Sequence, residues 1–244
     1  DHGAFLLNKI AADFPNQFLN VGISEQNMIS VAAGLASCGK KVYTYSINNF
    51  TAIRALEQIN LDICANNLDV NMIGVGAGFT YSTDGPSHHG LQDMAAVINL
   101  PNVAVYNVSD ASSSLGLARL SRFRGPKYFR IEKGKNENLY TDDFSFDSGI
   151  GVFYLSDNPE TIIVSTGEIT QTAVSVARHF RDCGTAVGVL DLLRVKPINE
   201  ELLLKSLSGV KNVICLEENL KSGGINEKLS SVFQKNKAKQ IIKK

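Results

Sequence analysis

Residues 21–41 read VGISEQNMISVAAGLASCGKK, in which one carboxylate, Glu25, opens an otherwise apolar helical pattern. Ser24 is a suitable N-cap, and the apolar pattern continues until Gly39. A helix that is apolar nearly all round is buried, so Glu25 would lie in or beside a low-dielectric region and would need a hydrogen-bond partner. The alternative is an acidic residue that only complements the helix dipole.

Strand and helix patterns alternate around this stretch. Residues 18–22 (FLNVG) indicate a short strand directly before it. Further strands are predicted at 40–46, 70–77, 102–108 and 127–133, with helices near 51–66, 91–99 and 111–122. A second series predicts strands at 161–166, 186–192 and 211–219, and helices at 169–184, 199–207 and beyond Gly224. Such alternation is typical of an α/β fold with parallel sheets.

A polar segment at 133–149 separates the two series. We therefore expect two open, mostly parallel-sheet α/β domains, at 1–134 and 149–244, joined by a linker at 135–148. The lysine-rich residues 235–244 are expected to be frayed or cut short.

Composition excludes several classes of protein. Lys and Arg together number 24, as do Asp and Glu, so net charge favours neither nucleic acid nor a membrane surface as partner. The chain shows neither an apolar stretch of membrane-spanning length nor a signal-peptide pattern at its start, which predicts a cytoplasmic protein. The four cysteines stand singly in apolar contexts and are expected to be reduced core thiols: Cys38, Cys64, Cys183 and Cys215.

A polar loop at 76–93, GAGFTYSTDGPSHHGLQD, follows a predicted parallel strand, where open α/β sheets bind ligands. Asp84, His88 and His89 crowd into it and predict a substrate-binding acid/base site. Solvated loop histidines are one alternative. A zinc site is the other, but further ligands at suitable spacing are missing, so no metal is predicted on this chain.

Other candidates carry weaker signals. Glycines at 74–78 suggest a dinucleotide loop, yet no helix pattern opens after them. Arg54 and Arg130 could bind an oxyanion or phosphate, or could snorkel or form salt bridges. From the pattern alone, Tyr45 and Phe50 are core aromatics.

Several strings occur in the order found in one known family: NVGISEQNM, YSINNF, RALEQI, TDGPSHH, NVSD and FRIEKG. Together they resemble the pyrimidine-binding domain of transketolase-type thiamine-diphosphate enzymes, most closely transketolase small subunits and then deoxyxylulose-phosphate synthase. STGEITQTA, LRVKPINEE and LEENLKSGG, in the second half, resemble the C-terminal domain of the same group.

The resemblance implies roles for individual residues. Glu25 would hydrogen-bond the cofactor's aminopyrimidine and favour the imino form that removes the thiazolium proton. Phe50 would stack on the pyrimidine, with Tyr45 as the second candidate because residues near Asn48 shift the register.

The resemblance also implies a substrate site. His88, as a second catalytic residue, and Asp84 would contact the hydroxyls and carbonyl of a sugar. Arg54 and Arg130 match substrate arginines of the synthase branch, and His89 and the Asp1-His2 pair would line the site with less support.

Two departures from the family pattern are informative. The chain lacks the preceding GDG-type domain that binds Mg²⁺ and the cofactor's diphosphate, so the resemblance implies a partner large subunit that carries both. Asn107 stands where several transketolases have a phosphate-binding arginine, so their acceptor preference does not transfer.

We therefore expect the small subunit of a split, transketolase-like enzyme that assembles into a heterotetramer and transfers a two-carbon ketol unit between sugars or sugar phosphates. Its cofactors would be thiamine diphosphate and Mg²⁺. The alternatives are a deoxyxylulose-phosphate-synthase-like acyloin condensation, the β subunit of a 2-oxo-acid decarboxylating component, and a non-catalytic partner module.

Overall fold

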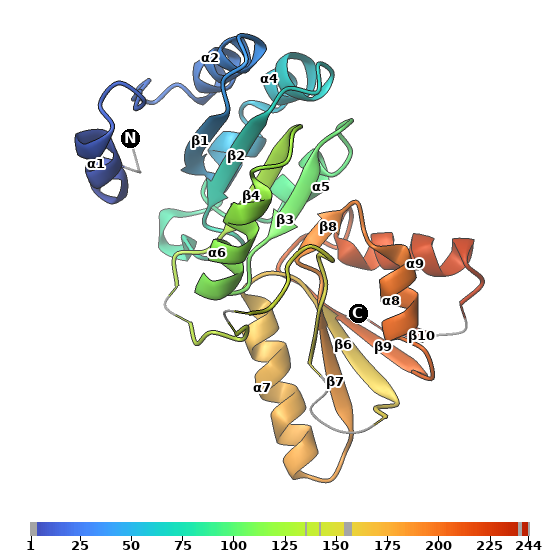
Figure 1. Cartoon of the computed structure of the whole chain (residues 1–244). Helices are drawn as coiled ribbons and strands as arrows, with labels where there is room; N and C mark the ends of the chain where they lie inside the picture. The colour runs from blue at the N-terminus through green and yellow to red at the C-terminus, as the bar shows by residue number, and fades with distance from the viewer. Residues whose placement is uncertain (1–3, 135, 142, 154–157, 239–240, 244) are drawn as a thin grey trace.

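The computed structural model describes residues 4–134, 136–141, 143–153, 158–238 and 241–243. Its strands form two five-stranded sheets flanked by helices (Figure 1). In each described sheet a single edge strand runs antiparallel to the rest. The predicted α/β class with two mostly parallel sheets is confirmed.

The first sheet has the strand order β1-β2-β4-β3-β8. These strands are β1 (Val42–Ile47), β2 (Val70–Val75), β4 (Lys127–Ile131), β3 (Ala104–Asn107) and β8 (Arg194–Lys196). The edge strand β8 comes from the second half of the chain and pairs antiparallel with β3. The other four are parallel, so their carboxyl ends lie at one edge of the sheet.

Alternate residues of this sheet face two helical layers. Val105 and Tyr128 belong to the core on one face, whereas their neighbours Tyr106 and Phe129 belong to the core on the other. The covering helices are α2 (Glu25–Ser37), the π-helix η1 (Ile59–Cys64) and α5 (Asp93–Val97) on the first face, and α6 (Ala111–Leu120) on the second. Because both faces are buried at the inner strands β2 and β4, these two appear in the sequence as mostly apolar runs, whereas the edge strand β1 is only partly buried.

The second sheet has the order β10-β9-β6-β7-β5. These strands are β10 (Ile241–Lys243), β9 (Asn212–Leu216), β6 (Thr161–Ser165), β7 (Val187–Asp191) and β5 (Gly151–Phe153). Helix α7 (Ile169–Asp182) packs on one face, and α8 (Glu200–Ser206) and α9 (Ile225–Lys235) pack on the other (Figure 1). Residues of both sheets, among them Met72 and Val164, belong to one continuous apolar core.

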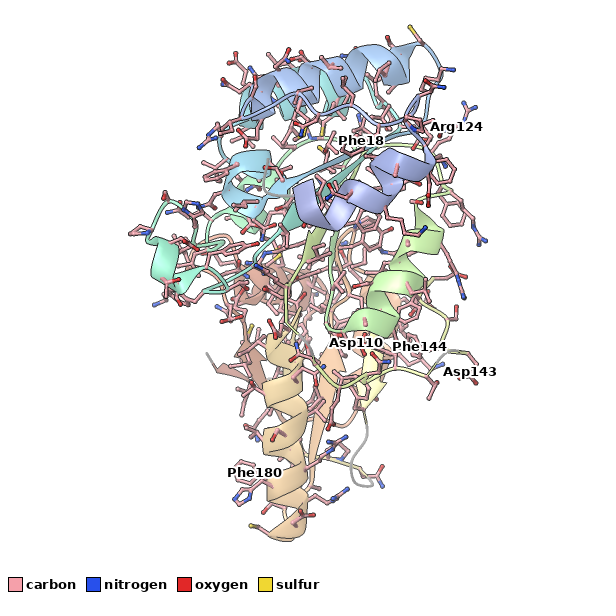
Figure 2. The ribbon with its side chains drawn as sticks, turned by 90° about the vertical axis from the view of Figure 1, so that its left-hand side faces the viewer. Phe18, Asp110, Arg124, Asp143, Phe144 and Phe180 are labelled. Atoms are coloured by element: carbon pink, nitrogen blue, oxygen red, sulfur yellow. The ribbon has the colours of Figure 1, made fainter. Side chains whose placement is uncertain are left out.

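The connector, the described part of residues 133–149, packs against α6 and the first sheet. Tyr140 and Phe146 are buried against α6 and the first sheet. Asp110, the N-cap of α6, accepts hydrogen bonds from the backbone N–H groups of Leu139 (2.5 Å) and Tyr140 (3.2 Å). Figure 2 shows Asp110 at one end of α6, and the Phe144 ring lies 4.6 Å from the ring of Tyr140. The proposed domain boundaries stay a prediction.

Several local predictions are wrong. Residues 18–22 form no strand. The helix predicted at 51–66 is broken into α3 (Asn48–Ala52), α4 (Leu56–Gln58) and η1. Helix α2 is buried on one side only, since Leu35 is 44% exposed, and Ser24 makes no side-chain cap. The lysine-rich end includes β10, which pairs with β9, so it is not simply frayed.

The structure also bears on cysteines and membranes. The four cysteines lie in the described part of the chain and form no disulfide. Cys64 and Cys215 are buried as predicted, but Cys38 and Cys183 are exposed, because each follows the last turn of a helix. Within the described ranges, no helix combines the length and apolarity needed to cross a bilayer.

Candidate functional site

Glu25 is the first residue of α2 and lies beside the carboxyl end of β1. Its side chain is largely buried, with 8% exposed. Arg54 donates a hydrogen bond from Nη1 to Oε2 at 2.7 Å, and the Ser46 hydroxyl donates to Oε1 at 3.2 Å. The expectation of a buried carboxylate with hydrogen-bond partners is therefore confirmed.

The environment of Glu25 keeps the carboxyl ionised. Burial alone would raise its pKa, because a low-dielectric surrounding disfavours the charge. The hydrogen bond and positive charge of Arg54, together with the Ser46 hydroxyl, outweigh burial, so the pKa of Glu25 lies below its ordinary value. The carboxylate is thus prepared to accept hydrogen bonds.

Aromatic rings lie next to this ion pair. The guanidinium carbon of Arg54 stands 4.0 Å from the centroid of the Phe50 ring. The ring of His88 meets Phe50 edge to face at 5.0 Å. Glu25, Arg54, Phe50 and His88 therefore form one continuous series of contacts, although they come from three separate segments. Tyr45 packs into the adjoining apolar cluster and has no described contact with Glu25.

The polar loop at 76–93, which we call the histidine loop, leaves the carboxyl end of β2, as predicted. Its base is closed by two 2.9 Å backbone hydrogen bonds between Gly78 and Gly90. Asp84 ends the short 3-10 helix η2 (Ser82–Asp84) and is exposed. His88 points to Phe50, whereas His89 packs edge to face on Phe79, so the two histidines contact different aromatic rings.

Tyr81 is a site residue that sequence reasoning missed. Its ring is buried, lies 6.4 Å from the ring of His88, and fills the space where a side chain at Gly76 would stand. Burial raises the pKa of its hydroxyl to about 12. The sequence did contain one indication of this role: Tyr81 is an aromatic residue within the polar TYSTDG segment, and a loop aromatic often packs on the core.

A second missed feature is a buried polar network beneath the loop. The Tyr128 hydroxyl lies 2.9 Å from Asp93 Oδ2 and 3.1 Å from Asn48 Oδ1. Arg130 Nε donates to Asp93 Oδ2 at 3.0 Å. The network joins β4, α5 and α3, so it sets the position of the helix that carries Phe50.

Arg130 is placed differently from Arg54. Its side chain is 2% exposed, pairs with Asp93 and donates to the carbonyl oxygens of Gly90 and Glu218. This geometry gives it an internal structural role, and its contact with a substrate stays a prediction. Asn107 is also buried, at the carboxyl end of β3, and its side-chain amide has no hydrogen-bond partner among the described residues. Asp1 and His2 lie outside the described residues.

The described residues contain no group of three or more His, Cys, Asp or Glu side chains that could hold a metal ion. The pyrimidine half of thiamine diphosphate, which the sequence resemblance implies, fits the site better. The carboxylate of Glu25 and the ring of Phe50 already contact a planar, nitrogen-rich cation, the guanidinium of Arg54.

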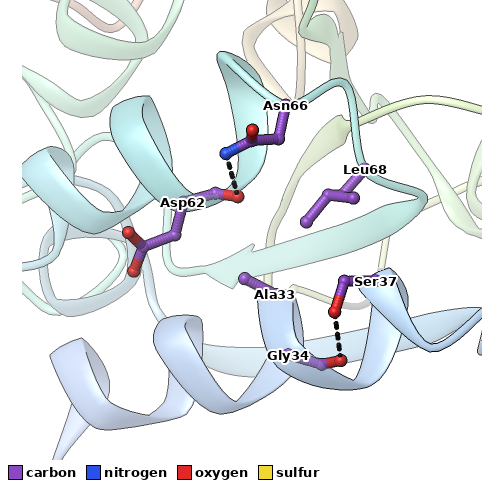
Figure 3. A pocket seen from close by; sticks show the side chains of 6 residues that line it. All are labelled: Ala33, Gly34, Ser37, Asp62, Asn66 and Leu68. Carbon is purple, nitrogen blue, oxygen red and sulfur yellow. Dashed lines mark hydrogen bonds between the residues drawn. The ribbon is translucent and has the colours of Figure 1, made fainter.

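A separate open pocket lies between α2 and η1, lined by Gly34, Ser37 and Asp62 among others (Figure 3). It begins about two helical turns beyond Glu25 and does not reach this site.

The fold and site of this chain are those of two consecutive transketolase domains. Residues 2–137 match the family described as "Transketolase, pyrimidine binding domain", and residues 152–243 match "Transketolase, C-terminal domain". The chain belongs to the transketolase family.

Individual relatives agree with this assignment. The chain is 31% identical to a putative transketolase C-terminal section of Methanocaldococcus jannaschii, covering 93% of this chain and 71% of the relative. It is also 31% identical to one subunit of the apulose-4-phosphate transketolase of Phocaeicola vulgatus, covering 91% and 72%. A solved structure described as "Split gene transketolase, inactive beta4 tetramer" matches with a TM-score of 0.84 and 30% identity, covering 95% of this chain and 75% of that one.

Proposed function

We propose that this chain is the small subunit of a split transketolase-like enzyme, which transfers a two-carbon ketol unit from a ketose donor to an aldehyde acceptor. In that reaction the donor's C2–C3 bond breaks and a new carbon–carbon bond forms to the acceptor's carbonyl carbon. The observation that carries the proposal is the buried, ionised carboxylate of Glu25 at the carboxyl edge of the first sheet, which Arg54 links to the Phe50 ring. The family's relatives that are named as subunits support it.

Thiamine diphosphate, when bound, would supply an acidic thiazolium carbon that becomes a nucleophile once its proton is removed. Glu25 would accept a hydrogen bond from the aminopyrimidine at Oε2 and so favour the imino form that takes up this proton. Phe50 would provide the stacking surface, and Tyr45 would support it from the adjoining apolar cluster.

The histidine loop would handle the sugar. His88, next to Phe50, would exchange a proton with a substrate hydroxyl, and Asp84 would bind a further hydroxyl from its exposed position on η2. His89 would line the outer side of the same loop. The relative named for apulose-4-phosphate supports a phosphorylated sugar as one substrate.

Mg²⁺ and the cofactor's diphosphate would be bound by a separate large subunit, and the two subunits would assemble into a heterotetramer in the cytoplasm. A synthase-like acyloin condensation would use the same carboxylate and loop and is the second candidate, because a relative named 1-deoxy-D-xylulose-5-phosphate synthase is 31% identical over 94% of this chain.

The test is calorimetry of thiamine diphosphate with Mg²⁺ against the chain alone and against the chain mixed with a large subunit that carries the diphosphate-binding domain. We expect weak binding and no turnover for the chain alone, and tight binding with turnover of a ketose and an aldehyde for the pair. Tight, metal-dependent binding to the chain alone would contradict the proposal.

A further inference from the structure

Arg54 makes two contacts that the proposed cofactor would also need. It donates a 2.7 Å hydrogen bond to Glu25 Oε2, and its guanidinium lies over the Phe50 ring at 4.0 Å. A protonated aminopyrimidine is likewise flat and cationic, donates N–H groups and stacks on aromatic rings. The guanidinium has the same combination of properties, unlike a lysine ammonium, which is a compact point charge without a stacking face.

We propose that Arg54 is a built-in stand-in for the cofactor's aminopyrimidine, which holds the place between Glu25 and Phe50 and must leave before the pyrimidine can enter. This inference rests on the proposed function, because it takes the same carboxylate as the pyrimidine site. It adds a competition within the chain for that site.

The location of Arg54 allows such an exchange. The residue lies in the turn that separates α3 from α4, outside any regular helix. Its side chain is 44% exposed, whereas the next residue, Ala55, is fully buried and anchors the turn. A long side chain on an anchored turn can swing into solvent without disturbing the core. An ion pair with one exposed partner is also weak enough to be displaced.

The ion pair with Arg54 stabilises the charged carboxylate of Glu25 while no cofactor is bound. An unpaired buried carboxylate is costly, so without Arg54 the pKa of Glu25 would rise and the side chain would be held less firmly, by Ser46 and the backbone. Arg54 keeps the carboxylate charged and in place until the cofactor arrives. The cost is a lower apparent affinity, because the pyrimidine binds only the fraction of molecules in which Arg54 has left.

The experiment is a nuclear magnetic resonance titration of the full chain with thiamine, which carries the aminopyrimidine but needs no metal or diphosphate ligands. The variants are Arg54→Ala, Glu25→Gln and the double variant, with Arg181→Ala as a matched control on an exposed arginine far from the site. We expect Arg54→Ala to bind thiamine roughly two- to fivefold more tightly than wild type. Glu25→Gln and the double variant should bind equally weakly, and Arg181→Ala should match wild type.

A second readout is the carboxyl-carbon shift of Glu25 against pH without thiamine. Its midpoint should rise in Arg54→Ala, and Arg54→Lys should fall between the two, because it keeps the charge but loses the flat stacking face. Arg54→Lys also tests the idea if the alanine variant fails to fold, since it should bind thiamine more tightly than wild type.

Two results would overturn the inference, and they are distinguishable. Equal or weaker thiamine binding by Arg54→Ala and Arg54→Lys, with binding still dependent on Glu25, would remove the stand-in role and leave the cofactor site intact. If no variant binds thiamine, or if Glu25→Gln leaves thiamine binding unchanged both with and without Arg54, the inference and the proposed pyrimidine site are both overturned.

Discussion

Asp191 at the end of β7 accepts a 2.5 Å hydrogen bond from the hydroxyl of Ser109, which follows β3, so one carboxyl joins the two sheets. Tyr140 of the connector donates to the same oxygen at 2.7 Å, and Thr170 of α7 donates to the other at 3.3 Å. Asp191 is fully buried. Elements of both sheets and of the connector therefore meet at a single titratable group.

This arrangement predicts a pH-dependent stability. Burial raises the pKa of Asp191 from 3.8 to about 7, even though three hydroxyl donors act in the opposite direction. The folded state then holds the proton more tightly than the unfolded state. The resulting stabilisation is complete below about pH 4 and is lost as the pH rises to about 7, with a total of about 4 kcal/mol.

Asp191→Asn removes this titration. The free energy of unfolding, measured by urea denaturation between pH 4 and pH 7, should change less with pH in this variant than in wild type. Asp182→Asn, an exposed aspartate on α7, is the control and should keep the wild-type profile. A profile in Asp191→Asn as steep as that of wild type would assign the pH dependence to other groups.

Two helical glycines should respond oppositely to alanine. A Cβ at Gly116 in α6 would overlap the Phe146 ring of the connector, whereas a Cβ at Gly34 in α2 would meet nothing within 4 Å. Gly116→Ala should destabilise the chain by about 1–3 kcal/mol through overpacking. Gly34→Ala should stabilise it by roughly 0.5–1 kcal/mol through helix propensity. Thermal unfolding of both variants checks the pair, and the same sign for both would contradict the packing of the connector on α6.

The ion pair of Arg130 and Asp93 should matter for stability. Arg130→Met leaves Asp93 charged and buried without its partner, so we expect a loss of about 3–5 kcal/mol in the free energy of unfolding. Arg181→Met breaks an exposed pair and should cost less than about 1 kcal/mol. If Arg130→Met proved as harmless as Arg181→Met and selectively weakened binding of a phosphorylated substrate, Arg130 would belong to the substrate site.

Glu25→Gln should separate folding from catalysis. Glutamine keeps the size of the side chain and can still hydrogen-bond, but it cannot hold the negative charge that the aminopyrimidine needs. In the proposed complex of this chain with a large subunit, we expect near-normal folding of the variant and a fall in turnover of roughly 10²–10⁴-fold. Proton exchange at the thiazolium carbon of bound cofactor should slow in parallel. Glu57→Gln, an exposed residue on α4, is the control, and wild-type exchange in Glu25→Gln would reduce Glu25 to a helix-start residue.

The sequence was most informative where burial produces a long pattern. The inner strands β2, β4, β6 and β7 were predicted because each is buried on two faces and reads as an apolar run. The three-residue strands β5, β8 and β10 were missed, because their pairing with distant strands defines them and three residues show no periodicity. The 51–66 helix is broken at the turn of residues 53–55, in which Ala55 is fully buried, and helical periodicity alone does not reveal this break.

The same limit applies to the site. Glu25 and the histidine loop were found because a charge in an apolar helix and a polar loop after a strand are local signals. The pairing of Glu25 with Arg54 joins residues 29 positions apart, and the contact of Asp191 with Ser109 joins residues 82 positions apart. Neither spacing follows from a local repeat, so both needed the structure.

The strand β8 has a consequence for how the coding sequence of such a protein can be divided. Strand β8 (Arg194–Lys196) pairs with β3 at the edge of the first sheet. If the gene were divided between the two sheets, one polypeptide would expose β3 as an open edge and the other would contain β8 without its pairing strand. Open edges invite aggregation, so selection would act against gene fission at that point. A gene fission upstream of both sheets would leave every described strand pairing within one polypeptide. The segments that form the two sheets are therefore expected to be inherited together.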